Sequence, residues 1–219
     1  MSISSPIVPA IIPKSYEDLI KQTSALRGLP ELHLDVVDGE FANVASWPYL
    51  TNDTVKQSYD LLSVFSLEVD LMVKKPLSAA RAWLEAGADQ LVFHIGTISA
   101  EALAGFTQEY DVTVALALSR TTTASELTPY LPYIDYVQVM GIAEIGTQGQ
   151  PFDESVIDQI KNLHREFPNL PLSIDGSVNE VTIPLLQGLP LSRFIVGSAI
   201  IHKENPKKEY ETLTTLARS

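Results

Sequence analysis

Short apolar blocks recur along the chain, and their pattern predicts eight strands that each precede a helix. In the block at residues 32–37, apolar positions alternate with positions that carry His33, Asp35 and Val37, a period of two that is typical of a strand. After the first block, Ser15 is typical of a helix N-cap. The other predicted strands are residues 6–12, 66–73, 90–94, 112–118, 134–140, 172–175 and 193–196.

Eight strand–helix alternations in 219 residues predict an α/β fold, a single (β/α)8 TIM barrel. No Pro/Gly/Ser-rich linker interrupts the alternation, so we expect residues 1–219 to form one domain. A doubly wound open sheet is the alternative, but that fold would carry a glycine-rich fingerprint after its first strand. Residues 12–16 contain no glycine, which favours the barrel.

Charge and composition restrict the classes of partner. A formal net charge of −12, without a cluster of lysines and arginines able to offset it, argues against nucleic acid. The chain has no cysteine, which excludes disulfides and thiolate chemistry and is compatible with a reducing compartment. We find neither an 18-residue apolar run nor the features of a signal peptide in residues 1–9. We therefore expect a cytoplasmic protein without a membrane partner, and homo-oligomer formation stays open.

Acids and histidines gather at the predicted strand ends, where (β/α)8 barrels have their active sites. His33 and Asp35 lie two residues apart in one strand, so their side chains project to the same side. Taken alone, the pair is interpreted as buried polar residues beside an Asp-Gly turn, with a metal or proton-transfer site as the alternative. Recurrence at several strand ends favours the functional interpretation; the further candidates there are Asp38, Asp70, Met72, His94, Met140 and Asp175.

For three other polar residues, the sequence either leaves a role in the site undecided or favours a place on the surface. His94 could equally be a site residue or a hydrogen-bonded polar group at a strand end. Isolated acids such as Glu31 and Glu68 are interpreted as surface charge.

Small residues follow the last two predicted strands and indicate an anion site. Gly176 and Ser177 follow the seventh strand, and Gly197 and Ser198 follow the eighth. Backbone N–H groups can approach an anion closely at such loops, and barrels commonly bind phosphate after strands seven and eight. The loop at residues 146–150, which contains Gly149, could supply a third wall. The alternative is that these glycines only form tight turns.

Several motifs of the chain resemble those of a known protein family. The motifs are HLDVVDGEF (33–41), DLMV (70–73), AGAD (86–89), FH (93–94), VM (139–140) with GQ (149–150), DG (175–176) and VGSAI (196–200). In this order, and over nearly the whole chain, they are similar to the ribulose-phosphate 3-epimerase family. The resemblance implies a phosphate-binding (β/α)8 barrel that interconverts D-ribulose 5-phosphate and D-xylulose 5-phosphate at C3, in the pentose phosphate pathway of carbohydrate metabolism.

The same resemblance implies roles for individual residues. One divalent metal ion (Zn²⁺, Mn²⁺, Fe²⁺, Co²⁺ or Mg²⁺) would be held by His33, Asp35, Asp70 and Asp175. Asp35 and Asp175 would also be the acid/base pair that moves protons to and from C3. The residues expected to contact the sugar phosphate are Met72, Met140, Gly149, Gly176, Ser177, Gly197 and Ser198.

Several positions depart from the family pattern, and two of them bear most on the implied site. Asp70 stands where the family has a second metal-binding histidine, and Pro13 stands where it has a serine. Three carboxylates and one imidazole form a harder ligand set, which favours Mn²⁺ or Mg²⁺ relative to Zn²⁺.

These departures keep two other functions open. One is a non-catalytic or altered-substrate sugar-phosphate-binding paralogue, although retention of Asp35 and Asp175 argues against it. The other is a keto-sugar-phosphate lyase on the same barrel, such as a decarboxylase or aldolase. Those enzymes carry an Asp-x-Lys-x-x-Asp pattern on the third strand, and residues 70–72 lack the lysine.

Overall fold

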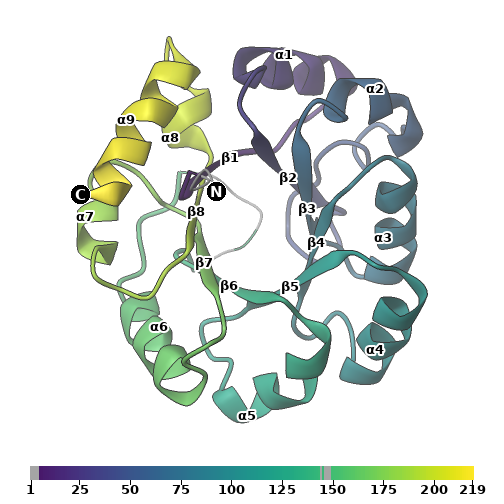
Figure 1. Cartoon of the computed structure of the whole chain (residues 1–219). Helices are drawn as coiled ribbons and strands as arrows, with labels where there is room; N and C mark the ends of the chain where they lie inside the picture. Colours follow the sequence, from purple (N-terminus) through teal and green to yellow (C-terminus); the bar gives the residue numbers. More distant parts are fainter. Residues whose placement is uncertain (1–4, 144, 146–148) are drawn as a thin grey trace.

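Eight parallel strands close into a barrel in the order of the sequence, with the helices outside it (Figure 1). The computed structural model describes residues 5–143, 145 and 149–219. The predicted (β/α)8 barrel is therefore confirmed. The strands are β1 (Ile7–Ile11), β2 (Glu31–Val37), β3 (Ser66–Met72), β4 (Gln90–His94), β5 (Thr113–Leu118), β6 (Tyr136–Met140), β7 (Leu172–Asp175) and β8 (Arg193–Val196).

The helices follow the strands, and the first helix is capped as the sequence predicts. Ser15 accepts a hydrogen bond from the Asp18 amide at 3.1 Å, so it is the N-cap of the first helix. The α-helices are α1 (Tyr16–Leu26), α2 (Tyr59–Leu62), α3 (Pro76–Glu85), α4 (Ala100–Glu109), α5 (Ala124–Leu127), α6 (Ser155–Glu166), α7 (Ile183–Leu186), α8 (Ser198–Ile201) and α9 (Pro206–Arg218). The 3₁₀ helices are η1 (Val55–Ser58) and η2 (Thr128–Tyr133). Among the described residues, none of the helices is long and apolar enough to cross a membrane.

The helix after β7 is shorter than the sequence predicts. The sequence suggests a helix from Asn179 to Gly188, whereas α7 covers only Ile183–Leu186. The Asn179 side chain accepts hydrogen bonds from the amides of Val181 and Thr182, at 2.9 and 3.2 Å. An asparagine that binds the following amides in this way forms a turn, which delays the helix.

Strand alternation separates an apolar outer core from a barrel interior that is charged on β2 and β3 and partly apolar on other strands. Leu32, Leu34 and Val36 of β2 belong to the large apolar cluster that the helices cover, together with Trp47, Trp83, Phe93 and Phe106. The intervening residues of β2 and β3 face inward, and the strand register pairs His33 with Glu68 and Asp35 with Asp70. The interior of the barrel is therefore lined by charged side chains on these two strands.

Candidate active site

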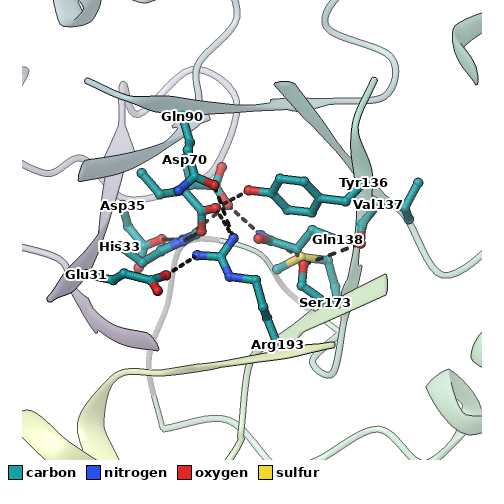
Figure 2. Close-up of polar contacts among 12 residues, drawn as sticks. Glu31, His33, Asp35, Asp70, Gln90, Tyr136, Val137, Gln138, Ser173 and Arg193 are labelled. Atoms are coloured by element: carbon teal, nitrogen blue, oxygen red, sulfur yellow. Dashed lines mark hydrogen bonds and ion pairs between the residues drawn. The ribbon is translucent and has the colours of Figure 1, made fainter. Parts of the chain in front are cut away.

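Four candidate ligands converge at the C-terminal end of the barrel. His33 and Asp35 come from β2, Asp70 from β3 and Asp175 from the end of β7. Each offers one ligand atom, and these atoms all lie within 4.8 Å of one another. Figure 2 shows His33, Asp35 and Asp70 in the barrel interior. We call these four residues the strand-end cluster.

The donor set of this cluster fits a divalent cation. Three carboxylates and one imidazole are ligands that Mn²⁺, Fe²⁺ and Zn²⁺ accept, and the carboxylates favour the harder ions. His33 and Asp70 are fully buried and Asp35 is 7 % exposed. Buried carboxylates packed this closely repel one another unless protons or a cation compensate their charge.

The environment of the cluster moves the affinity of each residue for protons. Burial raises the pKa of Asp175 to about 8, and the charge of Asp35 adds to the rise. Burial also raises the pKa of Asp35, although its hydrogen bond with His33 opposes this. Burial opposes ionisation of Asp70 as well, but His94 and His33 outweigh it, so the pKa of Asp70 is lowered. Burial disfavours protonated His33, yet the surrounding carboxylates raise its pKa well above the usual range. The cluster therefore holds protons at neutral pH that a cation would displace.

Asp70 has its own pair of supporting side chains. His94 Nε2 of β4 lies 2.6 Å from Asp70 Oδ1, and the Gln138 amide of β6 donates to Asp70 Oδ2 at 2.8 Å. The ring of Phe41 packs 4.9 Å from the His94 ring. This places His94, which the sequence left undecided, beside the strand-end cluster. Gln138 was not singled out from the sequence, although it precedes Met140 by two residues and so shares its face of β6.

Glu68 is buried, and its interpretation as surface charge is wrong. It is 1 % exposed, and its Oε1 lies 2.5 Å from His33 Nδ1. Its other oxygen lies 2.5 Å from Arg193 Nη1 and accepts a hydrogen bond from the Tyr136 hydroxyl. Burial opposes ionisation, but His33, Arg193 and Tyr136 lower the pKa of Glu68 to about 2. Glu68 precedes Asp70 by two residues and therefore shares its inward face, a signal that the sequence already contained.

A cavity of about 450 Å³ opens above the strand-end cluster. Asp35 and Asp175 both line it, whereas His33 and Asp70 do not. The structure brings every predicted sugar-phosphate residue to its wall: Met72, Met140, Gly149, Gly176, Ser177, Gly197 and Ser198. Residues 146–148 of the proposed third wall lie outside the described residues.

Backbone contacts fix the path of the chain after Asp175, the last residue of β7. The Gly141 amide donates to the Asp175 carbonyl at 2.7 Å. A Cβ atom at Gly141 would lie 2.4 Å from the carbonyl oxygen of Gly176, so only glycine allows the two strand ends to approach this closely. Ser177 follows with φ of 55° and donates its hydroxyl hydrogen to the Gln150 carbonyl. The loop after β7 is thus held against the loop after β6.

One basic side chain lines the cavity among the described residues, and the sequence did not single it out as a site residue. Lys203 follows α8, and its Nζ lies 3.7 Å from Glu180 and 4.0 Å from Glu209. An ammonium group here can attract an anion locally despite the net charge of −12. Lys203 lies shortly after the VGSAI motif (196–200), and α8, which packs against β1 and α9, leads the chain to its place at the cavity.

The fold and the cavity define a (β/α)8 barrel with an acidic centre and glycine-rich loops at its strand ends. Its backbone is similar to 3-hexulose-6-phosphate synthase from Salmonella typhimurium, with a TM-score of 0.71 and 14 % sequence identity over 97 % of this chain and 98 % of that one. Identity this low shows a shared fold alone.

Sequence comparison defines the family. Residues 6–201 match the ribulose-phosphate 3 epimerase family, so the chain belongs to this family of sugar-phosphate isomerases. It is 24 % identical over 210 residues to the ribulose-phosphate 3-epimerase of Schizosaccharomyces pombe, covering 94 % of this chain and 91 % of that relative. It is 28 % identical over 211 residues to the ribulose-phosphate 3-epimerase of Mycobacterium bovis, covering 91 % and 87 %.

Proposed function

We propose that this protein is a metal-dependent epimerase that interconverts D-ribulose 5-phosphate and D-xylulose 5-phosphate at C3. One observation carries the proposal: Asp35 and Asp175, from the non-adjacent strands β2 and β7, line the same cavity. Inversion at a carbon needs one group that removes a proton from one face and another that delivers a proton to the opposite face. Two carboxylates on different strands suit this requirement.

The proton steps follow from the two environments. In one direction, ionised Asp35 removes the C3 proton, and the electrons of the C3–H bond move into an enediolate across C2 and C3. Asp175, in its protonated form, delivers a proton to C3 from the other face; burial and the charge of Asp35 raise its pKa and so favour that form. In the reverse direction the two aspartates exchange roles.

The cation and the cavity walls would support these steps. A divalent cation held by His33, Asp35, Asp70 and Asp175 would supply positive charge that stabilises the enediolate oxygens. Met72 and Met140 would provide a wall that cannot take up or release protons. Backbone N–H groups at Gly149, Gly176, Ser177, Gly197 and Ser198 would hold the phosphate, with Lys203 adding positive charge.

Isotope exchange tests the proposal directly. The protein is loaded with Mn²⁺, Zn²⁺, Fe²⁺ or Mg²⁺ and incubated with ribulose 5-phosphate in D₂O, and deuterium at C3 is followed by NMR. We expect exchange accompanied by formation of xylulose 5-phosphate. Absence of exchange with all four metals rejects the epimerase, and tight sugar-phosphate binding without exchange would identify a non-catalytic paralogue.

A further inference from the structure

A continuous polar chain runs through the barrel interior from its N-terminal end to the strand-end cluster. Arg193, at the start of β8, contacts Glu31 at 3.2 Å (Figure 2). It also contacts Glu68 at 2.5 Å. Glu68 in turn contacts His33 at 2.5 Å. The proposed mechanism uses only the last member of this chain.

The two ring nitrogens of His33 face different partners. Nδ1 faces Glu68 Oε1 at 2.5 Å. Nε2 faces the strand-end cluster, 3.1 Å from Asp35 Oδ1 and 3.8 Å from Asp70 Oδ2. An imidazole binds a metal ion through the nitrogen that carries no hydrogen, so the hydrogen must reside on the other nitrogen.

We propose that Glu68 is a positioning residue: by accepting the Nδ1 hydrogen of His33, it directs the free electron pair of Nε2 at the cation. The inference rests on the metal dependence proposed above. Carboxylates that orient metal-binding histidines in this way commonly change metal affinity by about 10- to 100-fold.

The neighbouring side chains restrict which hydrogen bonds the Glu68 carboxylate can form. Arg193 and Tyr136 both donate to Oε2, so Oε1 is the oxygen that remains for His33. The side chain is 1 % exposed, and water cannot replace a lost partner easily. Glu68 and His33 are also direct neighbours in the register of β2 and β3, which fixes their approach through the backbone.

The test measures Zn²⁺ binding by isothermal titration calorimetry in three variants. In Glu68→Gln, one amide oxygen must serve the three donors that converge on Glu68, and charged Arg193 competes for it with His33. We expect Zn²⁺ affinity to fall about 10- to 100-fold. The double variant Glu68→Gln/Arg193→Met removes the charged competitor, leaves the amide oxygen to His33 and Tyr136, and should recover most of the loss. Glu31→Gln is the matched control, because it removes a carboxylate of the same chain that does not contact His33; its affinity should stay within about 3-fold of wild type.

A second readout reports the ring of His33 itself. The chain has four histidines, so ¹⁵N-histidine labelling of the Zn²⁺-loaded protein gives few signals. We expect a hydrogen-bearing Nδ1 for His33 in the wild type and loss or displacement of that signal in Glu68→Gln. Circular dichroism verifies that each variant is folded.

The outcomes separate this inference from the proposed function. If the wild type binds neither Zn²⁺ nor Mn²⁺, the metal dependence fails and the role of Glu68 fails with it. If the wild type binds Zn²⁺ and Glu68→Gln binds it equally well, only the inference about Glu68 is rejected. Equal losses in Glu31→Gln and Glu68→Gln would also reject it, because total charge would then matter instead of the contact to His33.

Discussion

Two acidic layers of the same barrel balance their negative charge differently. The inner layer consists of Glu31, Glu68 and Arg193. There, Arg193 forms an ion pair with Glu68, and the pKa of Glu68 is lowered to about 2. In the strand-end cluster, the part of the chain that the structure describes offers Asp35 and Asp175 no arginine or lysine in an ion pair, and their pKa values are raised. The inner layer contains Arg193, which balances its negative charge. The strand-end cluster, which is the outer layer, needs a proton or an external cation to balance the charge of Asp35 and Asp175. This difference supports the proposal that the strand-end cluster carries out the chemistry.

Replacing Asp175 of the strand-end cluster should have the largest effect on activity. Asp175→Asn removes the proposed proton donor to C3, and we expect epimerisation to fall by about 10²- to 10⁴-fold. Coupled-enzyme kinetics with ribulose 5-phosphate measure the change. Asp60→Asn, at an exposed position in α2, should leave the rate unchanged. Full activity in Asp175→Asn would reject the two-aspartate mechanism.

Breaking the inner pair should destabilise the fold. Arg193→Met leaves Glu68 buried without its cation, and we expect the free energy of unfolding to fall by about 3 kcal/mol. The estimate is at the low end for a buried pair because the Arg193 side chain is 18 % exposed. Urea denaturation measures the change, with Arg81→Met as the matched control. Arg81 pairs with Glu109 at 3.3 Å, both side chains are roughly half exposed, and the loss there should stay below about 1 kcal/mol. Equal losses at the two sites would contradict the contrast between the layers.

Metal affinity of the outer layer should depend on pH. Without a cation, Asp175 has a pKa of about 8, and a metal ion must displace its proton below that pH. Apparent affinity should therefore rise with pH by up to about 10-fold per unit for this proton and level off above about pH 8. Calorimetry at pH 6, 7 and 8, in buffers of different ionisation enthalpy, measures both the affinity and the protons released. Binding that releases no protons would show that the cluster is already ionised.

The smallest effect is expected at the cavity wall. Lys203→Gln removes a positive charge near the proposed phosphate position, and we expect KM for ribulose 5-phosphate to rise roughly 2- to 5-fold with kcat unchanged, because a partly exposed ion pair contributes only about 0.4–1 kcal/mol. Lys208→Gln, in α9 and away from the cavity lining, is the control. A fall in kcat without a change in KM would place Lys203 in the chemistry and not in binding.

Local patterns were sufficient to predict the barrel and much of its site. The period of two in β2 separates Leu32 and Leu34 from His33 and Asp35, and the structure places the first pair in the outer core and the second inside the barrel. Strand ends converge in any parallel barrel, so Asp175 could be placed near Asp35 before the fold was known. The helix predicted from Asn179 failed because the side chain forms a turn with the following amides.

The sequence by itself determined the strand order, the inward face of each strand and the acids at the strand ends, because these follow from short-range periodicity and from the closure of parallel strands. Only the tertiary structure decided which charges are balanced. Glu68 and Arg193 are 125 residues apart, and Lys203 reaches the cavity from beyond β8. The local sequence around an acid on a strand does not show whether its partner is water, an arginine or a bound cation. Strand register and barrel closure determine that partner.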